Sequence, residues 1–519
     1  MSTRKKQKAK PPEPAKMTRK IPATMATQHP DHANVPFWKR NGDAFVHAQE
    51  EVEECFGAFQ DLECQEYMWD WEGKYVDEAV VDKLFSNHFE FFSKTRLGRD
   101  AFLTFRLPNI WLEKGYRLAR AYMGILTFED LSRDLGHTTP PVFEVILPMT
   151  DEAQKLIHLQ RTFDQVAKLK YRVFGQEREF GRLRVIPLIE GMQELTATRK
   201  ILDDYMKLYE DEYHERLDYL RPFVARSDPS LNNGLIAATI AAKVALSEHY
   251  RFQDDTGIAV HPIIGVGCLP FRGGLSPHRL KEFLTEYRGV RTVTVQSAFR
   301  YDYDYEEVKR AIAYLNHALA EGRPTPYTSQ QVKQGEQLCT LFGDIYQKTI
   351  EQLAPMVNEV AQAIPQRRER LLHFGLFGYA RGVRGIRLPR AIGFTAALYS
   401  FGIPPELIGA GRGLRLAAKK GLSNLVELFY TNVRRDLIEA GTYLNKENLR
   451  FLIERSSAWR DVQEDIKAVE SFLGEELGPR EPEHFLHRNF ASNSYFLWHA
   501  GRDFSEPVLE AAKLRRSLG

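Results

Sequence analysis

Cysteine is scarce in this chain: its 519 residues include four, Cys55, Cys64, Cys268 and Cys339. Their spacing fits neither a zinc site nor a disulfide framework. No apolar run approaches the ~20 residues that span a bilayer, and the N-terminus lacks the apolar core of a secretion signal. We therefore expect a cytoplasmic protein with no membrane partner.

A surplus of charge of either sign is also missing. The chain has 71 Lys and Arg against 69 Asp and Glu, a formal net charge of +2, which argues against nucleic-acid binding over the whole surface. The first 16 residues differ, because they combine Lys and Arg with Pro and almost no apolar side chains. We expect a disordered basic tail over 1–16, which either solubilises the chain or tethers it weakly to RNA or membrane.

What the sequence does contain is a recurring pattern of short apolar runs. The runs are apolar throughout, as in strands buried on both faces of a parallel sheet. Helical periodicity fills the stretches between them, for example at 203–220 and 304–322. This alternation predicts an α/β fold, a (β/α)8 TIM-type barrel with additional α-helices. The predicted strands cover 66–71, 102–108, 142–148, 184–190, 221–228, 259–267, 291–299 and 371–379.

Two regions interrupt the strand–helix repeat. Residues 328–364 have the pattern of one long helix that Pro365 stops, and the chain becomes mostly helical from about 385 to 519, most strongly at 446–473. The length exceeds the ~250 residues of a bare barrel. We therefore expect one catalytic domain over 17–519, in which both regions are helical additions to the barrel.

Two acidic residues directly follow apolar runs that are neighbours in the predicted barrel. VIPLIE ends on Glu190 and PFVARSD ends on Asp228. Active sites of such barrels lie at the carboxyl ends of the strands, and adjacent strands are about 5 Å apart, so the two carboxylates can share a divalent cation. Mg²⁺ or Mn²⁺ accepts one or two carboxylates together with substrate oxygens. The alternative is that each carboxylate caps the helix that follows.

Two polar loops offer further chemistry. TQHPDHAN (27–34), which we expect to precede the first strand, holds His29, either a base or an inert surface histidine. GCLPFRGGLSP (267–277) combines Gly273 and Gly274, whose backbone can approach an anion, with Arg272. A guanidinium can grip a phosphate or carboxylate with two parallel hydrogen bonds.

Arginine recurs at or beyond the predicted strand ends. Several arginines at one barrel mouth indicate a doubly or triply anionic substrate, and surface ion pairs are the alternative for each one. The candidates are Arg106, Arg300, Arg381 and Arg390. Gln296 opens the run QSAFRYDYD, and WDWEGK (69–74) adds Asp70, Glu72 and Lys74 in a supporting or closing role.

Taken in order, these motifs resemble those of phosphoenolpyruvate carboxylase, specifically its short, archaeal-type form. TQHPDHAN resembles the TAHPTE histidine loop of the long bacterial and plant enzymes, VIPLIEGMQEL resembles VxPLFET, and FVARSDPSLNNGLIAA resembles MIGYSDSxKDxG. LPFRGGLSP resembles the second half of HGRGGxxGRGG, TVQSAFRYDY resembles TEQGExIRFKY, and RLPRAIGFTAAL resembles LRAIPWIFAW. The order is preserved from residue 27 to about 411.

The resemblance implies a barrel enzyme that converts phosphoenolpyruvate and bicarbonate into oxaloacetate and phosphate, via carboxyphosphate and a metal-bound enolate. It implies that Glu190 and Asp228 bind Mg²⁺ or Mn²⁺, and that His29 is the base that deprotonates carboxyphosphate. Arg272 would hold the transferring phosphoryl group, Arg390 would steady the phosphate or CO₂, and a homotetramer is expected. The expected substrate contacts are Arg106, Gln296, Arg300, Arg381, Gly273 and Gly274.

The sequence departs from the family pattern at three charged positions. The lysine of SDSxKD falls at Leu231, and the histidine and first arginine of HGRGG fall at Ile264 and Val266. If the reaction is the same, other residues supply these charges. The candidates are Arg106, Arg226, Arg300 and Arg381.

Two other functions stay open. One is another metal-dependent barrel enzyme that acts on a pyruvate enolate, such as an aldolase or C–C lyase, which predicts no bicarbonate dependence and no phosphate release. The other is a non-catalytic protein whose basic tail binds nucleic acid. The clustering of polar residues at the predicted strand ends argues against the second.

Overall fold

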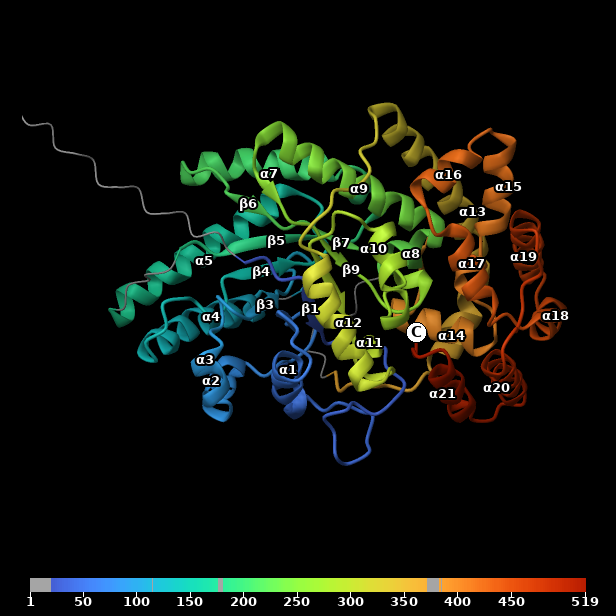
Figure 1. Cartoon of the computed structure of the whole chain (residues 1–519), viewed down its shortest axis with the longest axis horizontal. Helices are drawn as coiled ribbons and strands as arrows, with labels where there is room; N and C mark the ends of the chain where they lie inside the picture. Colours follow the sequence, from blue (N-terminus) through green and yellow to red (C-terminus); the bar gives the residue numbers. More distant parts are fainter. Residues whose placement is uncertain (1–19, 114, 176–180, 371–381, 384) are drawn as a thin grey trace, which may run out of the picture.

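The computed structural model describes residues 20–113, 115–175, 181–370, 382–383 and 385–519, so the basic tail expected over 1–16 lies outside it. Eight parallel strands close into a barrel in the order β1-β10-β9-β7-β5-β4-β3-β2 (Figure 1). They are β1 Thr24–Thr27, β2 Glu66–Asp70, β3 Phe102–Arg106, β4 Glu144–Leu147, β5 Arg184–Ile189, β7 Phe223–Ala225, β9 Ile263–Gly265 and β10 Thr292–Val295. The predicted barrel is confirmed.

A strand that the sequence analysis does not identify closes the barrel. β1 pairs with both β10 and β2, which places Thr24 opposite Val293 and Met25 opposite Glu66. TMAT has four residues, too few to show a strand pattern. The expectation that TQHPDHAN precedes the first strand is therefore wrong, because this loop follows β1. The run expected as the last strand, 371–379, lies outside the described residues.

Both faces of the strands are buried, as their apolar composition requires. Alternate residues point into the barrel and form a core of their own: Met25, Met68, Ile146, Ile186, Leu188, Phe223, Ala225 and Ile263. Their sequence neighbours, such as Ala26 and Trp69, pack outward against the helices. Because side chains alternate along a strand, a register shift of one residue would exchange the two sets.

Helices surround the strands on the outside (Figure 1). The predicted helices at 203–220 and 304–322 correspond to α7 and α12, and both end earlier than expected. The helices up to residue 318 are α1 Glu51–Gln60, α2 Val80–Asn87, α3 Phe89–Lys94, α4 Tyr116–Asp134, α5 Ala153–Phe174, α6 Met192–Thr196, α7 Thr198–Tyr213, α8 Ser227–Asn233, α9 Leu235–Thr256, α10 Leu280–Glu286, α11 Ser297–Tyr301 and α12 Tyr305–Ala318.

The helical additions gather on one side of the barrel (Figure 1, orange to red). The long helix expected over 328–364 is α13 Ser329–Ala361, which packs against α9 and begins at a capping box on Thr328. The stretch 446–473 forms two helices, α18 and α19, rather than one. The later helices are α14 Ala391–Ser400, α15 Ala410–Lys419, α16 Ser423–Phe429, α17 Val433–Gly441, α18 Lys446–Arg455, α19 Trp459–Leu473, α20 Pro482–His499 and α21 Ser505–Leu514.

Smaller elements complete the described chain. Two short strand pairs stand apart from the barrel, β6 Tyr219–Leu220 with β8 Ala259–Val260 and β11 Gly382–Val383 with β12 Ile386–Arg387.

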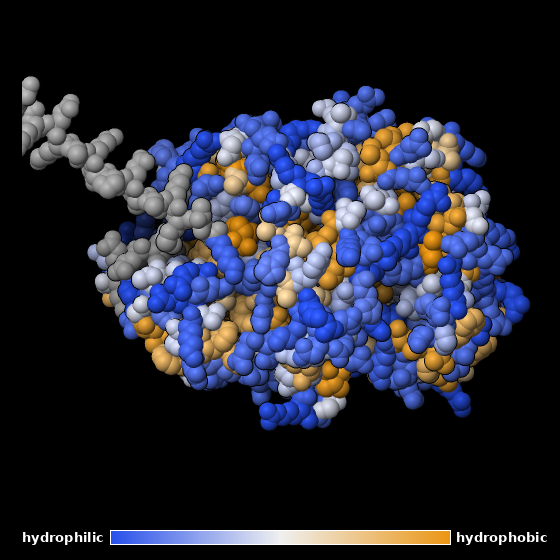
Figure 2. All heavy atoms as spheres, in the orientation of Figure 1, coloured by the Kyte–Doolittle hydropathy of each residue, from blue (hydrophilic) through white to orange (hydrophobic). Residues whose placement is uncertain are grey.

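No one helix of the described ranges is long and apolar enough to cross a membrane. A single pair of helices bent by 97°, Ala391–Ser400 with Pro405–Lys419, passes by length and composition alone. The face seen in Figure 2 is mainly hydrophilic with separate hydrophobic patches.

A buried ion-pair network joins the amino-terminal ends of the strands. Arg221 Nη1 donates to Glu144 Oε2 (2.6 Å), and Arg221 Nη2 donates to Glu66 Oε2 (2.6 Å) and to Thr292 Oγ1 (3.0 Å). The side chains of Arg221, Glu66 and Glu144 are at most 2% exposed. One guanidinium thus connects β2, β4 and β10 to the chain that enters β7.

Replacing Arg221 by Ala should destabilise the fold strongly, because Glu66 and Glu144 would lose the cation that compensates their buried charges. We expect the free energy of unfolding, measured by urea denaturation, to fall by ~3–5 kcal/mol. The matched control is Arg435→Ala, which removes an exposed ion pair with Glu282 and should cost less than ~1 kcal/mol. Equal losses in the two variants would contradict a structural role for this network.

Candidate active site

A cavity of about 590 Å³ opens at the carboxyl ends of the barrel strands. Its floor is formed by barrel-interior side chains, including Met68, Leu188 and Phe223. The predicted site residues that line it are His29, Arg106, Glu190, Asp228, Arg272, Gln296 and Arg390. Gly273, Gly274 and Arg300 are not among the lining residues, and Arg381 lies outside the described part of the chain.

Glu190 and Asp228 come from neighbouring strands. Glu190 directly follows β5, and Asp228 lies in the first turn of α8, two residues beyond Arg226 at the end of β7. β5 and β7 are paired, with Ile189 opposite Val224. Both carboxylates are 8% exposed. Both also line a second cavity of about 290 Å³, so the two cavities share these residues.

The donor set at these two residues fits a hard divalent cation. Carboxylate oxygens are the ligands that Mg²⁺ and Mn²⁺ prefer, and one or two of them suffice when substrate and water supply the others. Within the described ranges no group of three or more His, Cys, Asp and Glu is placed to hold a metal. Glu190 and Asp228 would hold such an ion together with substrate and water oxygens.

A backbone N–H from the turn after β4 supports Glu190. Met149, which follows β4, has a φ of 52°, in the left-handed region that non-glycine residues rarely adopt. Its N–H donates to Glu190 Oε2 at 3.1 Å. Strained backbone of this kind persists where surrounding structure holds it, frequently at functional sites. The sequence gives no signal for this contact.

His29 lines the same cavity as the two carboxylates, and one of its ring nitrogens is already engaged. Its Nδ1 is 2.8 Å from Thr27 Oγ1, and Nε2 has no hydrogen-bond partner among the described residues. Burial, followed by the charges of Arg106 and Arg272, lowers the pKa of His29 well below its ordinary 6.5. A neutral imidazole with a free nitrogen can accept a proton at neutral pH.

Arg106 lines the cavity with its charge compensated. Its Nε and Nη2 donate to the two oxygens of Asp70 at 2.8 and 2.6 Å, and Nη2 lies 3.0 Å from Glu72 Oε2. Burial alone would raise the pKa of Asp70, but Arg106 and then Lys74 hold it below its usual range. The WDWEGK motif therefore supplies counter-charges at the site.

Arg272 is held by partners on several elements. Nε donates to Ser227 (3.1 Å), Nη1 to Asp31 (3.1 Å) and to the carbonyl of Gly519 (2.5 Å), and Nη2 to Gln296 (2.5 Å). The following Gly273 has a φ of 113°, and a Cβ there would lie 2.4 Å from Val266 Cγ1. The glycines of this loop therefore allow the turn that points Arg272 inward.

Arg300 and Arg226, both proposed from the sequence as sources of charge, are used inside the protein. Arg300 Nη2 donates to the carbonyl of Thr27 (2.7 Å) and to Glu54 (3.0 Å). Arg226 donates from all three guanidinium nitrogens to hydroxyl groups, those of Tyr287, Ser230 and Thr239. A substrate role for Arg300 stays a prediction.

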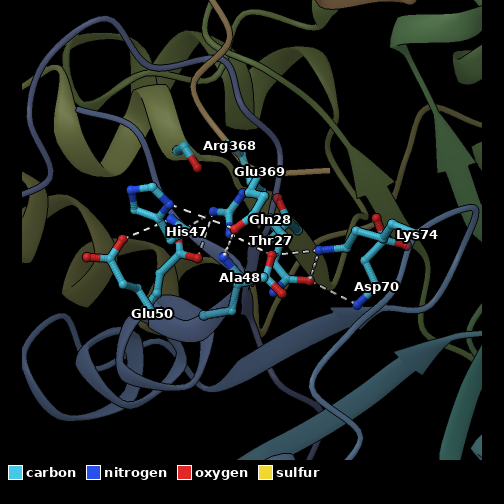
Figure 3. Close-up of polar contacts among 12 residues, drawn as sticks. Thr27, Gln28, His47, Ala48, Glu50, Asp70, Lys74, Arg368 and Glu369 are labelled. Carbon is cyan, nitrogen blue, oxygen red and sulfur yellow. Dashed lines mark hydrogen bonds and ion pairs between the residues drawn. The ribbon is translucent and has the colours of Figure 1, made fainter. Parts of the chain in front are cut away.

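Three arginines that the sequence pattern did not single out also line the cavity: Arg367, Arg368 and Arg370. They follow Pro365, in the gap between the predicted long helix and the predicted last strand. Arg368 is buried and donates to Glu51 (3.1 Å) and to both oxygens of Glu54 (2.7 Å each), next to the Thr27 and Gln28 loop (Figure 3). The one signal available was three arginines within QRRER.

Known proteins with similar sequences indicate the family of this chain. A model of the phosphoenolpyruvate carboxylase family matches residues 21–519. The chain belongs to the phosphoenolpyruvate carboxylase family. A family member of Leuconostoc mesenteroides is 40% identical over 91% of this chain and 94% of its own, and one of Metallosphaera sedula is 39% identical over 96% and 100%. The resemblance to the short form of this enzyme family is confirmed.

The similarity to solved structures is weaker. A malate synthase of Haloferax volcanii covers 87% of this chain and 99% of its own at 11% identity, with a TM-score of 0.35. That score is too low to bear on fold or function. Membership of the phosphoenolpyruvate carboxylase family thus rests on sequence, and the barrel on its own strand pairing.

His29 of this carboxylase should be neutral at pH 7. Because folding lowers its pKa, the stability that neutral His29 contributes is present above pH ~6.5 and is lost as pH falls through the lowered pKa. We expect NMR spectra of ¹⁵N-histidine-labelled protein to show a neutral His29 ring at pH 6.5. His29→Asn identifies the resonance, and a ring half-protonated at pH 6.5 or above would contradict the burial argument.

Proposed function

We propose that this enzyme carboxylates phosphoenolpyruvate with bicarbonate, giving oxaloacetate and inorganic phosphate, in anaplerotic carbon fixation. The observation that carries the proposal is that Glu190 and Asp228, from paired strands, open on the same cavity as His29 and Arg390. Two acidic metal-ligand candidates, a neutral base and cationic groups match the requirements of phosphoryl transfer followed by carboxylation. The names of the relatives support the same reaction.

Glu190 and Asp228 would hold Mg²⁺ or Mn²⁺, which acts as a Lewis acid toward an anionic substrate oxygen. Arg390, which directly precedes α14, would bind an anionic group in the same cavity. Arg272 would point its one uncommitted Nη2 hydrogen at the substrate, since its partners take the other four donors. Gln296 keeps that guanidinium in place.

The bond changes place the proton on His29. A bicarbonate oxygen attacks phosphorus and the bond from phosphorus to the enol oxygen breaks, which leaves carboxyphosphate and the enolate of pyruvate. His29 Nε2 takes the proton of carboxyphosphate, whose C–O bond then breaks to give CO₂ and phosphate. The enolate carbon bonds to CO₂ to form oxaloacetate, and His29 returns its proton to phosphate.

The enolate has to meet CO₂ before water protonates it. The cavity floor of Met68, Leu188, Phe223 and Ala225 is apolar, so it gives water no hydrogen-bond partners next to the reacting carbon. We expect polar substitution there to divert the enolate to pyruvate.

A coupled assay for oxaloacetate tests the proposal. Purified protein should form oxaloacetate from phosphoenolpyruvate only with bicarbonate and with Mg²⁺ or Mn²⁺. Glu190→Gln and Asp228→Asn should each lower kcat/KM by at least ~100-fold, because loss of even an indirect supporting contact at a metal site costs ~10–100-fold. The same variants should bind Mn²⁺ more weakly in electron paramagnetic resonance titrations.

Glu282→Gln is the matched control, because it removes an ion-paired carboxylate that does not line the cavity and should leave turnover unchanged. No oxaloacetate under any condition would refute the proposed function. Product formation without bicarbonate would instead favour an aldolase or C–C lyase.

The cellular context is proposed from family resemblance. We propose a cytoplasmic homotetramer whose catalytic unit is one barrel domain over 17–519. We expect the purified chain to sediment in the analytical ultracentrifuge as a single species of four subunits.

A further inference from the structure

The cavity contains positive charge that the described protein does not neutralise. Arg106 has Asp70 and Glu72 beside it, and Arg272 has Asp31. Among the described residues neither Arg370 nor Arg390 has a hydrogen bond or an ion pair, and Arg370 Nε is buried without a partner. Burial, and then the nearby charge of Arg390, lowers the pKa of Arg370 to about 9. Both side chains are half-buried, and the charge of Asp70 acts on Arg370 in the opposite direction but forms no ion pair with it. Two neighbouring cations without an ion-pair partner are unfavourable in such a place.

The chain that carries Arg370 is fixed rather than adaptable. Val46 N–H donates to the carbonyl of Arg367 (3.0 Å), and Glu369 N–H donates to the carbonyl of Val46 (2.8 Å). Ala48 N–H donates to Glu369 Oε2 at 2.9 Å, and Arg368 is bound to Glu51 and Glu54 (Figure 3). The ordering cost of presenting Arg370 is therefore met by folding, before any ligand binds.

Arg370 lies close to the reacting groups. Its charge is among those that lower the pKa of His29, after burial and Arg106 and Arg272. It lines the same cavity as Glu190 and Asp228. An anion between Arg370 and Arg390 would thus lie within reach of the base.

Charge matching indicates which anion. Two guanidinium groups without an ion-pair partner among the described residues fit a doubly charged tetrahedral phosphoryl group, whereas a carboxylate or bicarbonate carries one negative charge. Guanidinium groups bind phosphate with two parallel hydrogen bonds, as a neutral or single-point donor cannot.

We propose that Arg370, together with Arg390, binds the phosphoryl group of the substrate and then the released phosphate. This inference rests on the proposed function. It puts Arg370 ahead of three of the four sequence-based candidates, because Arg226 and Arg300 donate to protein partners and Arg106 is paired. The fourth, Arg381, lies outside the described residues. Leu231, Ile264 and Val266, where family charges are missing, are buried apolar residues.

The test compares Arg370→Gln and Arg370→Lys with Arg435→Gln, an exposed arginine paired with Glu282. Calorimetric titration with inorganic phosphate should give a Kd ~10- to 100-fold higher for Arg370→Gln, the range for losing a charged hydrogen-bonding partner. Arg370→Lys should lose less, because it keeps the charge without the planar fork. Arg435→Gln should match the wild type.

Three further readouts separate binding from structure. KM for phosphoenolpyruvate should rise in Arg370→Gln while KM for bicarbonate stays within twofold. The pKa of His29, followed by NMR, should rise when the Arg370 charge is removed. The Tm without ligand should be unchanged or higher, since a half-buried charge without an ion-pair partner has been removed.

Specific outcomes would overturn the inference. A phosphate Kd within twofold of wild type in both variants would do so, and so would weaker oxalate binding with phosphate binding intact, which would assign Arg370 to the substrate carboxylate. If Arg370→Gln does not fold, Arg370→Lys and Arg390→Gln carry the same comparison. Wild-type protein that binds phosphate through Arg370 but forms no oxaloacetate would refute the proposed function alone.

Discussion

A buried guanidinium destabilises a fold unless carboxylates or other hydrogen-bond acceptors lie beside it, and this constraint acts at both ends of the barrel. At the amino-terminal ends of the strands, Arg221 bridges Glu66 and Glu144, the first residues of β2 and β4. Behind the mouth, Arg368 bridges Glu51 and Glu54 of α1 and fixes a segment more than 300 residues away in sequence. In both places one arginine with two carboxylates ties together elements that hydrophobic packing alone would not position so specifically.

The cavity at the carboxyl ends departs from this rule where a ligand is expected. Arg106 and Arg272 have carboxylate partners there, whereas Arg370 and Arg390 have none among the described residues. Such a conflict fits the anion site proposed for Arg370 and Arg390, because a bound anion would relieve it. Burial in the same surroundings lowers the pKa of His29, so one environment would suit both the proposed base and the proposed anion site.

Much of the fold was predictable, since strands buried on both faces leave an apolar run that is visible in sequence. β5 and β7 are examples, and because each run ends in a carboxylate, Glu190 and Asp228 were placed together correctly on the cavity wall. β1 was missed because four residues of mixed character, TMAT, carry no periodic signal. It is a strand because it pairs with β10 and β2, and β10 lies far from it in the sequence.

The sequence by itself determined the strand–helix alternation, the family and the two acidic residues at adjacent strand ends, because these depend on local pattern and on order along the chain. Only the tertiary structure decided how each arginine is used. The sequence around Arg300 and Arg370 does not show how each is used. Arg300 donates to Thr27 and Glu54, whereas Arg370 lines the cavity. The reason is that the state of a charge depends on which carboxylates fold against it, and those lie hundreds of residues away.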